Sequence, residues 1–221
     1  MNGLLLVNKP VGITSFDVIR RLRVVSGIRK IGHAGTLDPL ASGLMLLLFE
    51  AACRRAEVLS KLNKRYLAVA QLGYNSTTGD GEGDKIAVSD LIPSRADIDT
   101  AAVQLTGVIT QVPSAYSAIK IRGQEAYKRV RAGETVEMPS RQVTVYELGI
   151  TSYEYPELKF DAKVSSGTYI RSLGQDLGAL LGTGAYLSGL IRTEVGEYHL
   201  EDAINLDEAN AGLIDSRLIG I

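Results

Sequence analysis

Apolar residues along this 221-residue chain recur at two spacings, which predict a succession of helices and strands. Apolar positions repeat at helical spacing behind Ser15, which is a suitable N-cap, and Gly27 follows the last turn. Continuous or alternating apolar runs indicate strands elsewhere. The expected helices cover residues 16–25, 51–62, 94–105, 125–131 and 166–181. The expected strands cover residues 44–49, 66–72, 117–121, 141–150, 158–164 and 190–198.

The predicted strands mostly follow one another rather than alternate with helices, and this order indicates the fold class. We expect an α+β fold with a mixed, largely antiparallel central sheet, flanking helices and a hairpin formed by residues 141–150 and 158–164. The Gly-rich residues 26–43 predict an ordered loop, and residues 75–84 predict a polar, solvated loop. Because we find no internal repeat or long linker, we predict one domain over residues 1–221.

Composition narrows the classes of protein that the chain can belong to. The longest apolar run, residues 44–49, is too short to span a membrane, and Asn8-Lys9-Pro10 interrupts the apolar start of the chain. The single Cys53 cannot form an internal disulfide, and one Cys with two His cannot complete a zinc site made of those residues alone. We therefore expect a cytoplasmic protein without membrane association, and chemistry without a metal.

The net charge of −1 hides an uneven distribution along the chain. Residues 1–65 contain eleven Lys and Arg against four acids, whereas the chain from Glu197 onward contains six acids and one Arg. This asymmetry fits one basic face that attracts nucleic acid, and it fits ordinary solvated helix surfaces equally well. Charge alone leaves both interpretations open.

The segment 32–43 is the strongest candidate for chemistry. Its glycines permit unusual backbone angles and close approach of a ligand, and Pro39 biases Asp38 away from the helical region. The segment therefore predicts either a rigidly held carboxylate or a simple Asp-Pro turn.

Several segments, in one order along the chain, resemble the TruB family of transfer RNA pseudouridine-55 synthases. The segment 32–43 resembles the signature loop of the family, and Asp38 falls on its catalytic aspartate. Departures from the family pattern include Ser114 in place of a second Pro and Ile191 in place of an Arg. The other matching segments are residues 3–15, 64–66, 111–120, 126–127, 166–173 and 190–193.

The resemblance implies a pseudouridine synthase fold and a set of catalytic residues. Asp38 would act at the sugar carbon C1′ while the N1–C1′ bond of a uridine breaks and a C5–C1′ bond forms. Arg171 would be the fixed cation that keeps this carboxylate ionised in a site without water. Tyr66 would stack on the uracil, and it is also a candidate for the final proton transfer, although a phenol with a pKa near ~10 is a poor base.

The resemblance also implies how the RNA is held. A stacked base must be flipped out before it can react, and His33 matches the residue that enters the RNA stack. Tyr169 and Leu190 match residues of the nucleotide pocket, and Lys9 is a candidate phosphate contact. Without the family pattern, each of these would be an ordinary structural residue.

The implied partner is the T-arm stem-loop of tRNA, and the implied reaction needs no cofactor. The resemblance stops before the C-terminal PUA RNA-binding domain that many bacterial relatives carry, so we expect weaker or differently organised contacts beyond the T arm. We also expect a monomer that acts without a guide RNA.

Two other functions share some of these features. A non-catalytic RNA-binding or tRNA-folding module would keep the basic face but would not need Asp38 opposite Arg171. A glycoside hydrolase would need a second positioned carboxylate, for which Asp80, Glu82 and Asp84 are available in the polar loop. The same run does not predict an EF-hand calcium site, because Lys85 stands where that loop requires Gly. Asp38, Tyr66 and Arg171 together favour the synthase.

Overall fold

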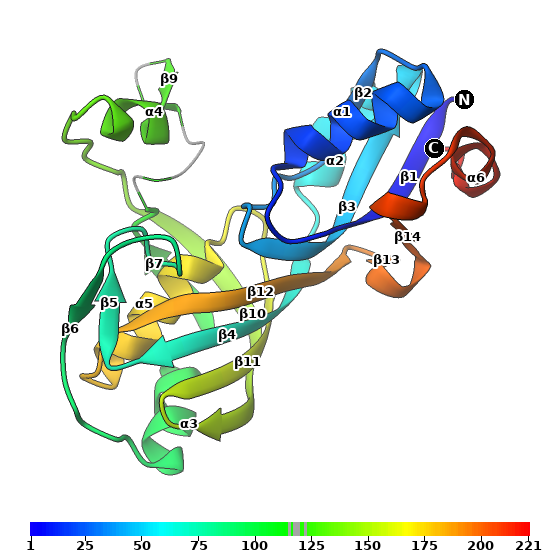
Figure 1. Ribbon diagram of the computed structural model, residues 1–221. Helices are drawn as coiled ribbons and strands as arrows, with labels where there is room; N and C mark the ends of the chain where they lie inside the picture. Colours follow the sequence, from blue (N-terminus) through cyan, green and yellow to red (C-terminus); the bar gives the residue numbers. More distant parts are fainter. Residues whose placement is uncertain (115, 117–119, 122) are drawn as a thin grey trace. The chain divides into compact units, whose positions relative to one another are not determined.

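A mixed sheet of ten strands is the main feature of the computed structural model, which describes residues 1–114, 116, 120–121 and 123–221 (Figure 1). The strand order is β14-β1-β3-β12-β4-β11-β10-β7, with β13 beside β12 and β2 beside β3. Among the described pairings, β1–β14 and β3–β12 are parallel. The strands of this sheet are β1 (Gly3–Lys9), β2 (Ile31–His33), β3 (Ala41–Phe49), β4 (Lys64–Leu72), β7 (Gly107–Gln111), β10 (Arg141–Glu154), β11 (Glu157–Val164), β12 (Ala185–Val195), β13 (Tyr198–His199) and β14 (Ile204–Asn205).

Helices and two short hairpins complete the described structure and confirm the predicted α+β class. The hairpins pair β5 (Tyr74–Ser76) with β6 (Lys85–Ala87), and β8 (Lys120–Ile121) with β9 (Gln124–Glu125). None of the described helices is long and apolar enough to cross a membrane. The helices are α1 (Ser15–Ser26), α2 (Ala56–Ser60), α3 (Arg95–Gln104), α4 (Ala126–Arg131), α5 (Ile170–Leu180) and α6 (Ala211–Arg217), with the 3-10 helices η1 (Glu50–Arg55), η2 (Leu200–Asp202) and η3 (Leu206–Glu208).

Contacts group the residues into two compact units. Unit 1 comprises residues 1–67, 163–166 and 189–221, and unit 2 comprises residues 68–162 and 167–188. The strands β4, β11 and β12 contribute residues to both units. The expectation of one domain over residues 1–221 therefore stays a prediction.

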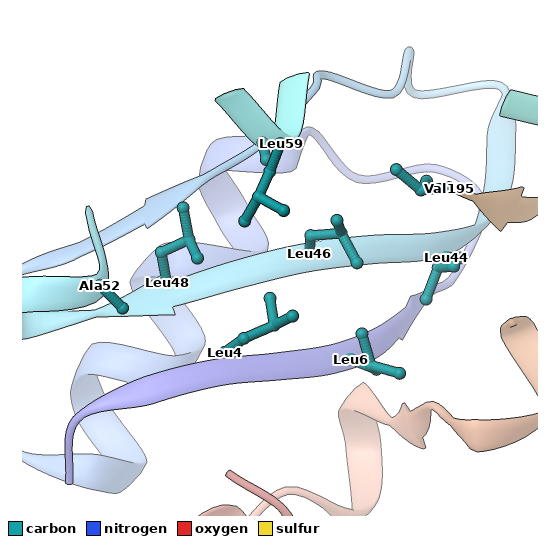
Figure 2. Close-up of a cluster of buried hydrophobic side chains, with 9 residues drawn as sticks. Leu4, Leu6, Leu44, Leu46, Leu48, Ala52, Leu59 and Val195 are labelled. Carbon is teal, nitrogen blue, oxygen red and sulfur yellow. The ribbon is translucent and has the colours of Figure 1, made fainter. Parts of the chain in front are cut away.

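The buried core of unit 1 follows from continuous apolar runs in β1 and β3. These strands pair antiparallel, with Leu4 opposite Leu48 and Leu6 opposite Leu46. Every second side chain therefore points to one face, where residues from η1, α2 and β12 complete a cluster (Figure 2). The alternate residues of both strands, such as Leu5 and Leu47, are also buried. Burial on both faces explains why the sequence is apolar throughout rather than alternating.

Helix α1 begins one residue earlier than the sequence predicted. Thr14, not Ser15, is the N-cap: its hydroxyl accepts a hydrogen bond from the Asp17 amide at 3.1 Å, and Asp17 Oδ2 accepts one from the Thr14 amide at 2.9 Å. Gly27 ends the helix with a positive φ of 70°, as its position predicted. The reciprocal capping box leaves the Ser15 hydroxyl available for another partner.

In unit 2, β10 and β11 form the predicted hairpin, and α3 packs near β10 and α5. Alternate residues of the hairpin strands are buried, among them Val143, Val145, Leu158 and Phe160. The predicted cap of α3 is confirmed, because Ser94 and Asp97 form a capping box.

Several predicted boundaries were wrong by a few residues. The helix expected over 51–62 divides into η1 and α2, and the helix expected from residue 166 begins at Ile170, because the φ of 84° at Gly167 is not helical. β12 ends at Val195 and starts earlier than residue 190. Most of the strand expected over 117–121 lies outside the described residues.

β4 begins at Lys64, two residues before the apolar pattern that predicted a strand from residue 66. Its ammonium is buried and donates to the carbonyl oxygens of Ser60, at 2.5 Å, and Leu62, at 2.6 Å. These carbonyls lie at and just beyond the end of α2, where the helix leaves acceptors without partners. Burial, and secondarily the charge of Arg192, lower the pKa of Lys64 to about 8.

The depressed pKa of Lys64 predicts how stability changes with pH. Between pH of about 8 and 10.5 the unfolded chain keeps a proton that folded Lys64 has released, so the free energy of unfolding should rise with pH in this window. We expect the free energy of unfolding of wild type, relative to that of Lys64→Met, to increase from pH 8 to 10 in urea titrations. Lys61→Met, on an exposed side chain, is the control. A constant or decreasing value would contradict the assigned burial of the charged group.

Candidate active site

Asp38 lies in unit 1 on the segment that joins β2 to β3. The segment has little regular secondary structure, yet backbone hydrogen bonds hold both of its ends. At the start of the segment, the Ala34 amide donates to the Leu46 carbonyl at 3.0 Å. At its end, the Gly12 amide donates to the Pro39 carbonyl at 2.8 Å, and the Ala41 amide donates to the Asp38 carbonyl at 3.1 Å. The predicted ordered loop is therefore confirmed, with β2 and the start of β3 inside its bounds.

Ser15 contacts the residue directly before Asp38. Its buried hydroxyl donates to the Leu37 carbonyl at 3.0 Å and accepts from the Leu37 amide at 2.8 Å. This contact is possible because Thr14 caps the helix in place of Ser15. One side chain thus satisfies both backbone polar groups of Leu37.

Arg192, on β12, holds the same segment from another strand. Its guanidinium donates to the carbonyls of Leu44 at 2.7 Å, Gly35 at 3.2 Å and Thr36 at 3.3 Å, and the residue is 1% exposed. Arg192 lies in one of the segments that resemble the family, but it had no predicted role. Two positions to either side of it stand Leu190 and Glu194, so no alternating apolar pattern in the sequence marked it as an inward-facing charge.

Lys9 was predicted to contact phosphate, and its burial argues against this. The side chain is fully buried, and its ammonium donates to the carbonyls of Pro10 and Ile13, both at 2.8 Å. Burial lowers its pKa to about 8; Asp38 opposes this shift, and Arg192 adds to it. A buried ammonium already bonded to carbonyls cannot reach RNA as it stands, so Lys9 supports the backbone after β1 and places a positive charge near Asp38.

His33 ends β2 and is half-buried. Burial, and secondarily the charge of Arg192, lower the pKa of its imidazole below the usual value. The side chain is therefore neutral at physiological pH. Its buried Nδ1 has no hydrogen-bond partner among the residues that the structure describes.

Tyr66 and Leu190 are both predicted pocket residues of unit 1, and each is 8% exposed. Tyr66 is the third residue of β4, and Leu190 pairs with Ala41 in the parallel register between β12 and β3. Ala41 lies three positions beyond Asp38, so the register places the strand of Leu190 beside the end of the segment that carries Asp38. The stacking role of Tyr66 stays a prediction.

Arg171 lies in unit 2, in the first turn of α5, and forms a buried ion pair. Its Nη1 lies 3.2 Å from Asp80 Oδ2 and 3.1 Å from the Thr78 carbonyl, and its Nη2 donates to the Tyr116 carbonyl at 3.0 Å. The two charged side chains are 5% and 6% exposed. The prediction that Asp80 is a solvated loop residue was wrong, because its side chain is buried in the ion pair with Arg171.

The loop that carries Asp80 is closed around the ammonium of Lys85. Lys85 Nζ donates to the carbonyls of Asp80 at 3.2 Å, Gly81 at 3.0 Å and Gly83 at 2.5 Å, and lies 4.5 Å from the centre of the Tyr186 ring. Asp80 Oδ1 also accepts from the Thr78 hydroxyl at 2.5 Å. These contacts fix the carboxylate that orients Arg171.

Tyr169 is the N-cap residue of α5 rather than a residue of its first turn. Its amide donates to Gln111 Oε1 at 3.0 Å, and Gln111 Nε2 donates back to its carbonyl at 3.2 Å. Arg141 lies over the Tyr169 ring, 4.7 Å from its centre, and bonds the Gly167 carbonyl. Gln111 and Arg141 had no predicted role. Gln111 differs from most polar residues in being buried, which the structure shows.

The predicted site residues therefore divide between the two units. Lys9, His33, Asp38, Tyr66 and Leu190 belong to unit 1, whereas Tyr169 and Arg171 belong to unit 2. The predicted pairing of Asp38 with Arg171 stays a prediction. Among the described residues, no group of three or more His, Cys, Asp and Glu could hold a metal ion.

Known proteins resemble the chain over nearly its whole length. It is 48% identical to tRNA pseudouridine synthase B of Thermobifida fusca (strain YX), covering 95% of this chain and 75% of that protein. It is 42% identical to tRNA pseudouridine synthase B of Burkholderia pseudomallei (strain 668), covering 98% of this chain and 72% of that protein. The chain thus spans about three quarters of these relatives.

Solved structures share the fold. One is an H/ACA ribonucleoprotein bound to a substrate RNA containing 2′-deoxyuridine, with a TM-score of 0.69 and 28% identity over 93% of this chain and 51% of that one. Another is a Cbf5-Nop10-Gar1 complex, with a TM-score of 0.70 and 29% identity over 93% of this chain and 53% of that one. The chain spans about half of each structure.

The family model described as TruB family pseudouridylate synthase (N terminal domain) matches residues 23–170, which include Asp38, Tyr66, Asp80 and Tyr169. This match covers more than half of the chain, and it agrees with the near-complete alignment to the two bacterial relatives. The protein belongs to the TruB family of pseudouridine synthases.

Proposed function

We propose that the protein converts a uridine in the T loop of tRNA, at position 55, to pseudouridine, with Asp38 as the catalytic carboxylate. The observation that carries the proposal is the placement of Asp38 on a segment whose backbone is fixed by buried groups. A non-catalytic module would need a surface that binds RNA, but it would not need a carboxylate held in this way.

The chemistry requires a carboxylate beside the sugar. The N1–C1′ bond breaks, the detached uracil turns, and C5 bonds to C1′; C5 then loses a proton and N1 gains one, so the product is an isomer of the substrate. The carboxylate can add to C1′ or accept the C2′ proton. In both routes Asp38 must begin as an anion.

We assign Arg171 the role of the fixed cation that favours this anion once the nucleotide excludes water. A guanidinium stays protonated throughout the physiological range, and in unit 2 it is buried and held by Asp80. The ion pair supports the assignment because it restricts the guanidinium to one orientation. Asp80 is thus a positioning residue for Arg171.

The remaining predicted residues form the proposed substrate contacts. Neutral His33 suits insertion into a base stack, since an uncharged ring loses less hydration than an imidazolium. Tyr66 and Tyr169 offer aromatic faces for the flipped base, and Leu190 offers an apolar wall. We propose that the T arm of tRNA is the partner and that the reaction proceeds without cofactor or guide RNA, on a monomer.

Position-resolved pseudouridine mapping on unmodified tRNA tests the proposal. Purified wild type without added metal or nucleotide should convert one T-loop uridine. Asp38→Asn should lower the rate by at least roughly a thousandfold, because the amide cannot act as an anion. Asp207→Asn, on an exposed side chain of η3, is the matched control for loss of a carboxylate. No product from wild type, or undiminished product from Asp38→Asn, would refute the function.

The proposed role of Asp80 predicts that its substitution slows turnover without weakening substrate binding. Asp80→Asn keeps the shape of the side chain but leaves Arg171 without its ion-pair partner. We expect kcat to fall by about ten- to a hundredfold and KM to change little, because a misplaced catalytic group slows the chemical step. Glu82→Gln, on an exposed side chain in the same loop, should match wild type. Equal rates for both variants would show that the ion pair is not needed for turnover.

Substitutions of Tyr66 separate stacking from proton transfer. Tyr66→Phe keeps the ring and should retain the wild-type rate within about tenfold. Tyr66→Leu removes the ring and should lose a further factor of about 5 to 150, since stacking of a base on an aromatic ring contributes ~1–3 kcal/mol. Single-turnover rates measure both. If Phe and Leu are equally inactive, the hydroxyl rather than the ring is required.

A further inference from the structure

Two buried polar side chains hold the backbone around Asp38 without being assigned any role in the reaction. Ser15 comes from the start of α1, and Arg192 comes from β12. Their described hydrogen bonds to this segment all go to backbone atoms. Both belong to unit 1, as Asp38 does.

Ser15 fixes the two peptide planes on either side of Leu37. Its hydroxyl accepts from the Leu37 amide at 2.8 Å and donates to the Leu37 carbonyl at 3.0 Å. The second of these planes contains the amide nitrogen of Asp38. The orientation from which the Asp38 side chain departs therefore depends on the Ser15 hydroxyl.

Arg192 fixes the preceding two carbonyls and ties them to the sheet. It donates to Gly35 and Thr36 in the segment and to Leu44 in β3. A planar guanidinium has donors in fixed directions, so three carbonyls bound to it cannot move independently. With Ser15, it holds three consecutive residues up to the one before Asp38.

Close approach of two strands lets Arg192 reach this segment. Gly43 on β3 pairs with Arg192 on β12, and its φ is 108°. A Cβ at this position would lie 2.3 Å from the Arg192 carbonyl oxygen, so only Gly fits. The Gly in the sequence motif thus serves the placement of the arginine.

Neither RNA contact nor an ion pair among the described residues accounts for the burial of Arg192. At 1% exposure its side chain cannot contact RNA directly. Its charge also lowers the pKa of His33, Lys9 and Lys64, so it adds repulsion among neighbouring basic groups. The contribution of Arg192 is therefore to fix the backbone carbonyls of the segment that carries Asp38 through its hydrogen bonds.

We propose that Ser15 and Arg192 are positioning residues that set the Asp38 carboxylate against the sugar carbon of the flipped nucleotide. The inference rests on the proposed function, because it requires Asp38 to be the catalytic carboxylate. A displacement of about 1 Å in a catalytic group can slow a reaction by roughly a hundredfold. Loss of either side chain therefore lowers the rate of the chemical step and leaves RNA affinity intact.

Single-turnover kinetics on unmodified tRNA test the proposal with Ser15→Ala and Arg192→Lys. Ala removes both bonds to Leu37, whereas Lys keeps the charge but not the planar set of donors. We expect rates about ten- to a hundredfold below wild type for both, with the dissociation constant for tRNA within about twofold of wild type. Rates are expressed per molecule competent to bind tRNA, so partial misfolding does not enter the comparison.

Two further variants separate positioning from general stability. Thr183→Val removes a buried hydroxyl that donates to the Gly184 carbonyl at 3.0 Å in unit 2, and it should react at the wild-type rate. Ser15→Thr restores a hydroxyl at the first position of α1 and should recover most of the rate that Ser15→Ala loses. Melting temperatures of all variants show whether rate follows stability.

The outcomes are distinct. Rates within about twofold of wild type for both Ser15→Ala and Arg192→Lys would overturn the inference, as would RNA affinity that falls in parallel with rate. A rate loss in Thr183→Val equal to that in Ser15→Ala would show a stability effect and also overturn it. Failure of Asp38→Asn to lose activity would instead overturn the proposed function.

Discussion

The central physical constraint in unit 1 is that the backbone segment that carries Asp38 must be held in place although it has few regular hydrogen bonds of its own. Helices and strands position side chains through their ladders, whereas the segment between β2 and β3 depends on donors supplied from elsewhere. Ser15, Arg192 and the Gly12 amide supply them. The capping of α1 by Thr14, the glycine at position 43 and the register of β12 against β3 all serve these contacts.

In unit 2 a buried ion pair, rather than hydrogen bonds to backbone alone, holds an irregular loop in place. Arg171 is buried, and a buried guanidinium needs hydrogen-bond acceptors around it. Asp80 and the Thr78 and Tyr116 carbonyls provide this environment. In unit 1 the buried cations Lys9, Lys64 and Arg192 bind carbonyl oxygens instead. Buried positive charge therefore organises irregular backbone in both units.

The sequence predicted the fold class, the ordered loop that carries Asp38 and most elements because their signals are local. Apolar runs determine β3, and capping residues determine the start of α3. The errors concern groups whose partners lie far along the chain. Asp80 looked like a solvated loop residue because its partner Arg171 lies 91 positions away. Lys9 differs, since its buried ammonium binds the carbonyls of Pro10 and Ile13, one and four positions away.

The error at Ser15 has a local cause with a distant effect. Thr14 and Ser15 are both good N-caps, and Asp17 decides between them because it lies three residues after Thr14. The side chain of Ser15 then turns to Leu37, 22 positions away. Arg192 gave no such signal, since an arginine in a strand is ordinarily solvated and its hydrogen bonds to carbonyls of other segments depend on the folded sheet.

The ammonium of Lys85 occupies the place in its loop that a metal ion takes in a calcium-binding turn, with three carbonyl oxygens directed at it. A metal ion is exchanged with the solvent, and its occupancy follows the ion concentration outside. Lys85 is joined to the loop by covalent bonds and cannot diffuse away. The loop that orients Arg171 therefore keeps its central positive charge under every ionic condition in which the lysine remains protonated.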